Sequence, residues 1–346
     1  MTEPLSYKDA GVDIENADAT KRAMAAALET TNRRVLNKIG AFASLFDASF
    51  PEMKHPVLVL KTEEPGSKQK LAFQHGRVRS ICFDMINHLV NDIIVMGATP
   101  LSVQDAVICG KLEKPIVNEI VAAIAAACKA QECVLTGGET SEQPGVIEPG
   151  TYILSSSIIG VVEKEHIIDG ASIAENDVVI AVESSGLHTN GYSLVRALMA
   201  RDPSLAASRV GDRSFLDTIL EPHRCYYDAV KGLFRHPGLH GMAHITGGGI
   251  GGNLDRILPP TLDASIDLTA IAPPPVFGVI QRHGNVTRED MLRTFNCGVG
   301  LTVVAAPHAA PEIVAHLNRF YPAYPIGRIL PGGKQVRFTG AMRFEP

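Results

Sequence analysis

Apolar residues along the chain form short continuous runs that alternate with longer segments in which they recur at helical spacing. The runs 57–60, 153–162 and 178–184 are typical of buried strands. The segments 80–97 and 116–128 carry the spacing of amphipathic or buried helices. Because strands and helices alternate in both halves, the pattern predicts an α/β (α+β) fold.

This pattern weakens at 164–177, a charged and turn-rich stretch without a long apolar period. A chain of 346 residues is long enough to bury two separate cores. We therefore place a domain boundary near residue 168, which predicts an N-terminal domain of residues 1–168 and a C-terminal domain of residues 169–346.

Two other segments are assigned from local signals. A helix is expected over 21–36, with Asp18 or Thr20 as its N-cap. The proline-rich segment 258–275 is expected to be a loop or linker.

Composition excludes several classes of protein. The net charge is −5 and there is no basic cluster, which argues against a nucleic-acid partner. No apolar run approaches the roughly 20 residues of a membrane span, and the polar, acidic N-terminus is not a signal peptide. The six cysteines form no Cys-x-x-Cys pair, so reduced thiols in a cytoplasmic protein are expected rather than a zinc or redox site.

A line of polar residues crosses the otherwise apolar helix 80–97. Asp84, His88, Asn91 and Asp92 fall at positions that share one face. Such a line can be an ordinary solvated face, but the rest of this helix has the composition of a buried one. We therefore expect the line to face a cleft.

Three glycine-containing segments follow predicted strands and could approach a ligand. In LTGGETSEQPG (135–145), two glycines precede a hard oxygen ligand at Glu139, although a plain turn fits equally well. In SSGLHTNGYSLVR (184–196), His188 and Asn190 precede a helix and are either site residues or a cap and a surface side chain. HITGGGIGGNLDRIL (244–258) has the strand–glycine–helix order of an anion site, without the Gly-x-Gly-x-x-Gly dinucleotide spacing.

The stretch VLVLKTEEPGSKQKLA (57–72) is harder to interpret. Gly, Ser and Lys directly after a strand are typical of a phosphate-binding loop, whereas adjacent carboxylates at Glu63 and Glu64 would repel phosphate. Pro65 also removes a backbone donor.

In their order along the chain, these stretches resemble one family, the phosphoribosylformylglycinamidine cyclo-ligases (aminoimidazole ribonucleotide synthetases). The matching motifs are SYKDAGVDI, NHLVNDIIVMGATP, TGGETSEQPG, GVVEKEHIIDG, SSGLHTNGYSLVR, HITGGGIGGN and RTFNCGVG. The resemblance implies conversion of formylglycinamidine ribonucleotide and ATP to aminoimidazole ribonucleotide, ADP and phosphate in purine biosynthesis. It also implies Mg²⁺, a homodimer whose N-terminal strands form a shared β-barrel, and a C-terminal α/β domain that holds the substrate phosphate.

The resemblance and the motifs together predict the following site residues. The metal ligands would be Glu63, Asp92 and Glu139. The nucleotide would contact Lys8, Asp9, Thr62, Gly66, Ser67, Lys68, Asp84, Asn91, Gly137, Gly138 and Thr140. The substrate would contact His188, Thr189, Asn190, Ser193, Thr246, Gly247, Gly248, Gly249 and Asn296. Catalytic roles would fall to Asp92, Lys68 and His188, the last in proton transfer or at the developing phosphate. Cys297 is expected to be a buried structural thiol.

The loop at 61–68 departs from the family motif Gly-Thr-Asp-Gly-Val-Gly-Thr-Lys. This chain has Lys61-Thr62-Glu63-Glu64-Pro65-Gly66-Ser67-Lys68, so Glu64 stands where the motif has glycine and Pro65 where it has valine. Glu64 would be strained if its position required φ > 0. We therefore expect a shifted loop path, with Glu63 as a metal carboxylate.

The implied reaction begins with attack of the formyl amide oxygen on the ATP γ-phosphate, followed by ring closure by the amidine nitrogen with loss of phosphate. Three alternatives stay open. They are a related kinase such as thiamine-phosphate kinase, another ligase of the superfamily, and a silent homologue that binds a nucleotide without turnover. Selenophosphate synthetase is disfavoured because the first cysteine is Cys82.

Overall fold

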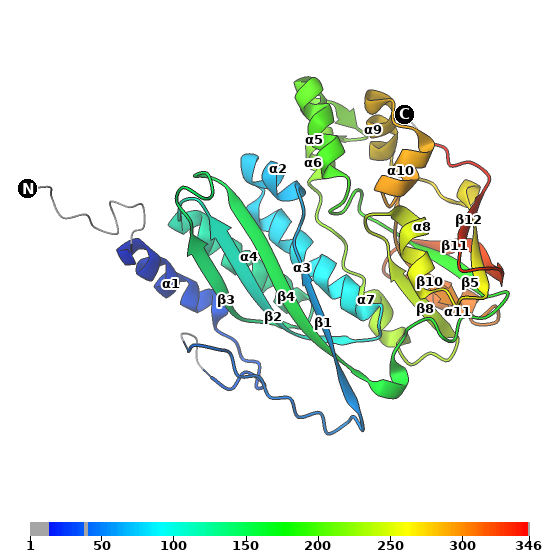
Figure 1. The fold of residues 1–346 in the computed structure, drawn as a ribbon, viewed down its shortest axis with the longest axis horizontal. Coiled ribbons are helices and arrows are strands. Elements are labelled where there is room, and N and C mark those ends of the chain that lie inside the picture. The colour runs from blue at the N-terminus through cyan, green and yellow to red at the C-terminus, as the bar shows by residue number, and fades with distance from the viewer. Residues whose placement is uncertain (1–13, 38–40, 345–346) are drawn as a thin grey trace, which may run out of the picture.

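The computed structural model describes residues 14–37 and 41–344, which fold around two β-sheets (Figure 1). The first sheet ends at Glu163 and the second begins at Val178. The boundary that the sequence predicts near residue 168 lies in the connection between them. Lys8 and Asp9, expected at the nucleotide, lie outside the described residues.

The N-terminal sheet has four strands in the order β1-β4-β2-β3. Only β2 and β3 are parallel, while the other neighbours are antiparallel. The strands are β1 (Pro56–Glu63), β2 (Thr99–Cys109), β3 (Val134–Glu142) and β4 (Tyr152–Glu163). The two edge strands carry two of the predicted ligand segments, because β1 leads into the 61–68 loop and β3 contains the GGET motif.

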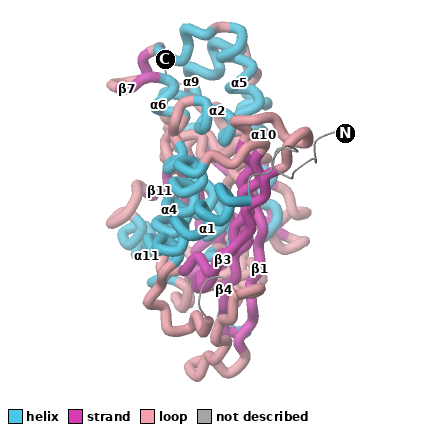
Figure 2. The backbone as a smooth tube through the Cα atoms, turned by 90° about the vertical axis from the view of Figure 1, so that its left-hand side faces the viewer, coloured by secondary structure: helices cyan, strands magenta, loops and turns pink. Residues whose placement is uncertain are grey.

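Helices cover one face of this sheet. They are α1 (Ile14–Leu28), α2 (Lys68–Gln74), α3 (Val78–Ile94) and α4 (Lys114–Ala130). Helix α3 packs against β1, β2 and β4, helix α4 lies beside it and contacts β3, and α1 packs on α4. Figure 2 shows α1 and α4 on one side of the strands. Packing between the sheet and the neighbouring helices explains why Ile86, Leu89 and Val90 are fully buried.

The opposite face of the sheet carries exposed apolar side chains. Leu58 and Leu60 alternate along β1 with inward-facing residues, and their exposed fractions are 52% and 68%. Ile153 and Ile159 of β4 are also exposed. Apolar side chains gathered on one sheet face are typical of a surface that another chain covers.

The C-terminal domain contains a six-stranded sheet in the order β12-β9-β11-β5-β10-β8. The strands are β5 (Val178–Glu183), β8 (Leu239–His244), β9 (Leu262–Asp267), β10 (Val299–Ala305), β11 (Ala323–Pro331) and β12 (Val336–Thr339), with a separate hairpin of β6 (Arg209–Val210) and β7 (Arg213–Ser214). The helices are α5 (Tyr192–Arg201), α6 (Phe215–Ile219), α7 (Tyr227–Val230), α8 (Gly249–Leu254), α9 (Pro275–Gly284), α10 (Arg288–Thr294) and α11 (Ala310–Leu317). Strand β10 is buried along its whole length, as expected for a continuous apolar run.

Several boundaries differ from the sequence predictions. Helix α1 begins at Ile14 and ends at Leu28, so Thr20 is no cap and instead donates to Asn16 O within the helix. The segment 258–275 is not only a loop, because it contains strand β9. The predicted strand at 133–136 continues through GGET to Glu142, because β2 provides a parallel partner along its length. Local residue preferences could not reveal that partner.

Candidate active site

The polar line on α3 faces the C-terminal domain, and part of it is hydrogen-bonded to backbone groups there. Asp84 accepts a hydrogen bond from His223 N, and Asn87 donates to His223 O. Asn91 donates to Arg224 O and accepts from Tyr226 N. These side chains bind the segment 223–226 and join the two domains. Asn91, expected at the nucleotide, thus has both ends of its amide engaged.

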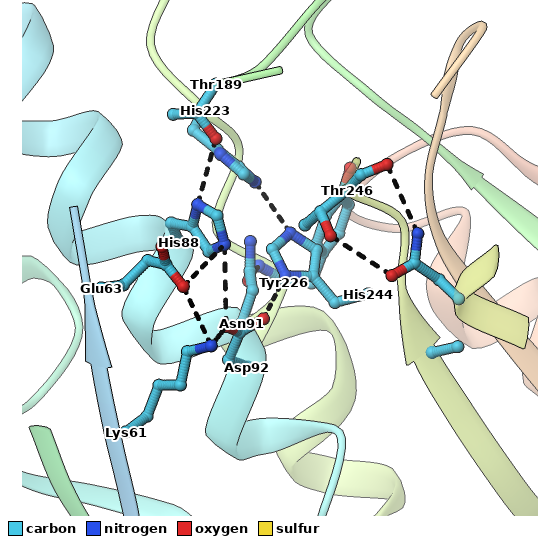
Figure 3. A network of polar contacts seen from close by, with 12 residues as sticks. Lys61, Glu63, His88, Asn91, Asp92, Thr189, His223, Tyr226, His244 and Thr246 are labelled. Atoms are coloured by element: carbon cyan, nitrogen blue, oxygen red, sulfur yellow. Dashed lines mark hydrogen bonds and ion pairs between the residues drawn. The ribbon is translucent and has the colours of Figure 1, made fainter. Parts of the chain in front are cut away.

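The remaining residues of the line meet the end of β1. Asp92 lies with Oδ2 3.0 Å from Lys61 Nζ and 3.6 Å from His88 Nε2. Glu63 Oε2 lies 2.9 Å from the same Lys61 Nζ and 4.0 Å from His88 Nε2 (Figure 3). Lys61 and Glu63 project from one face of β1, the face toward α3. Two carboxylates therefore converge on a single ammonium group.

The electrostatics of this cluster favour the ionised forms of Lys61 and Asp92. Burial would raise the pKa of Asp92, but the hydrogen bond from His244 and the positive charge of Lys61 hold it below its usual value. Burial would lower the pKa of Lys61, and the bonds to Glu63 and Asp92 outweigh it and raise that pKa. Lys61 is thus a fixed positive charge at neutral pH.

A chain of two histidines continues from Asp92 into the C-terminal domain. His244 Nδ1 lies 2.7 Å from Asp92 Oδ1, and His244 Nε2 lies 2.9 Å from His223 Nε2. An ionised carboxylate only accepts, so the His244 proton is assigned to Nδ1 and its Nε2 accepts from His223. The ring of His188 stacks on His223 with centroids 3.8 Å apart. The result is a continuous path from carboxylate to imidazole to imidazole.

Burial keeps most of these imidazoles neutral. Desolvation, with the nearby positive groups, lowers the pKa of His188 and His223 well below the usual value. Burial and His244 lower the pKa of His88 to about 4. His188 Nε2 accepts from Ser185 N at 3.2 Å, which assigns its proton to Nδ1, and that atom is buried with no partner. His188 therefore holds an unused N–H donor.

The 61–68 loop is compact and places its polar groups on different sides. Thr62 lies on the sheet face away from Glu63 and shares a hydrogen bond with Ser157. Glu64 is exposed, Pro65 is buried, and the positive φ of this loop (+62°) falls on Gly66. The expected strain at Glu64 is therefore absent.

Lys68, the first residue of α2, is fully buried. Its Nζ lies 2.9 Å and 2.8 Å from the two oxygens of Asp84 and 2.7 Å from Glu221 O. The ammonium group of Lys68 is thus engaged in a buried ion pair with Asp84. Contact of Lys68 or of Asp84 with a nucleotide stays a prediction, as does that of Ser67, which precedes α2.

The two predicted substrate segments do come together. Gly66 lies beside Thr189, because a Cβ at Gly66 would be 3.4 Å from Thr189 O. Thr189 Oγ1 is 3.0 Å from His88 Nδ1. A Cβ at Gly247 would be 3.3 Å from Asn190 Oδ1. The HTN and TGGG segments are therefore neighbours in the folded chain.

The TGGG turn has a built-in support that the sequence did not reveal. Asn253 donates to the carbonyl oxygens of Thr246, Gly247 and Gly249. A Cβ on Gly249 would lie 1.9 Å from Leu292 O, and Gly248 has φ +96°. Only glycine fits this path. Asn253 holds the carbonyl groups of the turn, while the amides of Gly248 and Gly249 donate to Arg293 O and Thr246 O.

Two other predicted substrate residues take different places. Asn296 is buried; its Oδ1 accepts from Gly298 N and Ser184 Oγ, while its Nδ2 donates to Gly186 O. It supports the loop before His188. Ser193 is exposed on α5, beside a surface depression lined also by Gln74 and Arg196. Cys297 is buried, as expected, and burial raises its pKa to about 12.

The GGET motif lies at the other edge of the sheet from β1. The register runs Glu63↔Ser156, Ser156↔Asp105 and Asp105↔Gly138 across the four strands. Three strand spacings put Gly138 roughly 14 Å from Glu63. Glu139 is exposed and one position further along. Within one chain, Glu139 therefore does not join Glu63 and Asp92.

Glycines of the GGET motif make room for a carboxylate that the sequence reading overlooked. A Cβ on Gly138 would lie 1.9 Å from Asp105 Oδ1, and Gly137 has φ +149°. Burial raises the pKa of Asp105 to about 7. Thr140 follows in the same strand and pairs with Val107. Asp105 lies in an ordinary strand sequence, so no motif signalled it.

Comparison with known proteins identifies the chain. The family model described as AIR synthase related protein, N-terminal domain, matches residues 50–162, and the corresponding C-terminal model matches residues 174–339. The phosphoribosylformylglycinamidine cyclo-ligase of Nitrosococcus oceani is 42% identical over 97% of this chain and 95% of its own. The enzyme of that name from Chromobacterium violaceum is 43% identical over 95% and 96%. The chain belongs to the phosphoribosylformylglycinamidine cyclo-ligase family.

Solved structures confirm the fold of this cyclo-ligase family member. HypE of E. coli matches with a TM-score of 0.69 and 16% identity, over 95% of this chain and 96% of that chain. A thiamine-monophosphate kinase from Stenotrophomonas maltophilia matches with a TM-score of 0.66 and 16% identity, over 96% and 98%. At such identities the likeness concerns the two-domain α/β architecture alone.

The residues of this cyclo-ligase family member that sequence reasoning missed share one property. Asn87, Asp105, His223, His244 and Asn253 act through positions that only the folded chain brings together. His244 was inside a recognised motif, HITGGGIGGN, and could have been singled out as an ionisable residue directly before the glycine turn. His223 had no local signal.

Proposed function

We propose that this chain is an ATP-dependent cyclo-ligase that converts formylglycinamidine ribonucleotide to aminoimidazole ribonucleotide, ADP and phosphate. The observation that carries the proposal is the convergence of family motifs from both domains on one cluster. Asp92 of the NHLVND motif is hydrogen-bonded to His244 of the HITGGG motif, and His88 of the former is hydrogen-bonded to Thr189 of SSGLHTNGYSLVR. A carboxylate, neutral imidazoles and a glycine turn are the groups that phosphoryl transfer and ring closure require.

Binding of the substrate phosphate is assigned to the turn at 246–249. Asn253 holds the carbonyl groups of the turn, which adjoins Asn190. The amides of Gly248 and Gly249 already donate to Arg293 O and Thr246 O, so the phosphate contacts assigned here fall to Gly247 N and to the side chains of Thr246 and Asn190. The unpartnered Nδ1–H of His188 is a donor for a developing negative charge on a transferred phosphoryl group or on the formyl oxygen.

Proton transfer is assigned to the path Asp92–His244–His223. Ring closure releases a proton from the amidine nitrogen. In the tautomers assigned above, the unpartnered Nδ1 of His223 accepts this proton while the Nε2 proton of His223 passes to Nε2 of His244, whose positive charge the ionised Asp92 stabilises. Because closure is intramolecular, correct orientation of the substrate supplies most of the remaining rate enhancement.

The magnesium that the family resemblance implies does not fit the predicted carboxylate set. Glu63 and Asp92 already converge on the ammonium of Lys61, and Glu139 lies at the opposite edge of the sheet. We infer that any magnesium is held chiefly by the phosphates of ATP, which are its usual ligands.

A homodimer is proposed from the exposed sheet face. Leu58, Leu60, Ile153 and Ile159 form an apolar face next to the exposed Glu139. A second copy on this face would cover the apolar side chains and bring Glu139 toward another protomer. A cytoplasmic location also stays a prediction; of the helices described, none has the length and apolar character to cross a membrane.

The test is a direct assay. The purified protein is mixed with Mg²⁺, ATP and formylglycinamidine ribonucleotide, and ADP and aminoimidazole ribonucleotide are measured together. Formation of both in equal amounts supports the proposal. Substrate-dependent ADP without the imidazole would identify a related kinase or ligase, and nucleotide binding without turnover would identify a silent homologue.

A further inference from the structure

Lys61 is a departure from the family motif that the proposed reaction does not use. The motif has glycine at this position, where no side chain could reach the neighbouring carboxylates. Here a lysine projects from the inner face of β1, two residues before Glu63 on the same face. Its side chain spans the gap from the sheet edge to helix α3.

The ammonium of Lys61 occupies the position at which the two carboxylates meet. Its Nζ is 2.9 Å from Glu63 Oε2 and 3.0 Å from Asp92 Oδ2. The imidazole of His88 lies on the same side, 3.6 Å from Asp92 Oδ2. Without the lysine, two carboxylate oxygens and an imidazole nitrogen would surround one point, which is a usual donor set for a divalent cation.

A divalent ion and this ammonium cannot share that point. Metal–oxygen distances for Mg²⁺ are about 2.1 Å, so an ion bound by both oxygens would lie almost on top of Nζ. Repulsion between a double and a single positive charge at such a separation is strong. The side chains are only partly exposed (36% for Lys61, 27% for Glu63 and 18% for Asp92), so water screens this repulsion incompletely.

We propose that Lys61 is a built-in cation: its ammonium takes the place of a divalent metal between Glu63 and Asp92. The carboxylates of Glu63 and Asp92 would then form a metal site that the side chain of Lys61 occupies. The lysine neutralises one of the two carboxylate charges and keeps Asp92 aligned with His244. The site adjoins Gly66 and Thr189, so the fixed charge also faces the region where the polyphosphate of a nucleotide is expected. Only this last point rests on the proposed function.

The test measures Mn²⁺ binding to nucleotide-free protein by electron paramagnetic resonance, because Mn²⁺ reports on Mg²⁺-type sites. Lys61→Met and Lys61→Gly, the latter restoring the residue of the family motif, are compared with wild type. We expect both variants to gain a site with affinity at least about tenfold higher than that of wild type, since removal of a unit charge so close to a divalent ion has at least this effect.

Controls locate the site and separate it from folding. Adding Asp92→Asn to Lys61→Met should abolish the gain. Lys129→Met, the same change at an exposed lysine, should bind like wild type. Circular dichroism checks that each variant is folded. If Lys61→Met does not fold, the comparison with wild type rests on Lys61→Gly.

Two results would overturn the proposal. One is wild-type protein that binds Mn²⁺ as tightly as the variants, with loss of binding on Asp92→Asn. The other is the absence of a new site in both folded Lys61 variants. Neither result depends on turnover, so failure of the cyclo-ligase assay and failure of this proposal are distinguishable.

Discussion

Lys68 Nζ lies within 2.9 Å of both carboxylate oxygens of Asp84, and neither side chain is exposed to solvent. The pair joins helix α2 to helix α3 and, through Glu221 O and His223 N, to the C-terminal domain. A buried pair of this kind is costly to break because one charge is then left without its partner.

We therefore expect Lys68→Met to reduce the free energy of unfolding by about 3–5 kcal/mol, measured by urea denaturation. The double variant Lys68→Met/Asp84→Asn should recover most of this loss, because Asn keeps an acceptor for His223 N without a charge. Lys70→Met, at an exposed position of the same helix, is the control. Loss of turnover by Lys68→Met at unchanged stability would show that Lys68 acts on the nucleotide instead.

The raised pKa of Asp105 predicts a pH-dependent stability. A carboxyl group whose pKa is about 7 in the folded state and about 4 when unfolded binds more protons when folded between these values. Its contribution to stability is present below about pH 4 and is lost as the pH rises through 7. Asp105→Asn should therefore raise the melting temperature relative to wild type at pH 8 more than at pH 5. An equal difference at both values would contradict a raised pKa.

Asp92 is hydrogen-bonded to His244 and paired with Lys61, so its removal should disable the proposed proton path. We expect Asp92→Asn to lower kcat by roughly 10² or more with little change in the melting temperature. Asp228→Asn, which alters an exposed ion pair with Lys231, provides the comparison. Near-normal turnover by Asp92→Asn would place the active site elsewhere.

The glycine turn allows a matched pair of substitutions. Gly249→Ala places a Cβ against Leu292 O at a residue with φ +63°, and should cost about 2–4 kcal/mol of stability. Gly252→Ala, in the same short helix, meets nothing within 4 Å. It should be neutral or stabilising by up to about 1 kcal/mol. Thermal unfolding of both variants compares them, and equal effects would refute the steric argument.

The exposed sheet face makes the proposed dimer testable. Leu60→Glu would place a charge in the centre of the apolar face formed with Leu58 and Ile159, and should shift the protein to a monomer in light scattering coupled to gel filtration. Val146→Glu, at a more exposed residue outside the strands, should leave the mass unchanged. A wild-type protein that is itself monomeric at micromolar concentration would remove the basis for this prediction.

The sequence predicted the fold and its main elements because long apolar runs and helical spacing are local signals. The α3 line of Asp84, His88, Asn91 and Asp92 was also visible, but not what each would contact. Three of the groups that these side chains bind on residues 223–226 belong to the backbone, and the sequence does not indicate where backbone groups will lie. The distance of Glu139 from Glu63 depends on strand order, and strand order is decided by long-range pairing that residue preferences do not encode.

The loop at 61–68 was likewise predictable from the sequence only in part. The substitutions at Glu64 and Pro65 were evident, and a shifted path was expected. The direction of each side chain was not, because it depends on where β1 ends and α2 begins. One residue more or less in the strand would exchange the faces of Lys61 and Thr62.

The hydrogen bonds between α3 and the backbone of residues 223–226 have a consequence for how the sequence of this segment can vary. Asp84, Asn87 and Asn91 bind main-chain groups, so these hydrogen bonds between the domains do not depend on which side chains residues 223–226 carry. The side chain of His223 is still constrained by its contacts with His88, His188 and His244. Residue 224 can therefore vary, and bring new chemistry toward the site, while the hydrogen bonds that join the two domains stay intact.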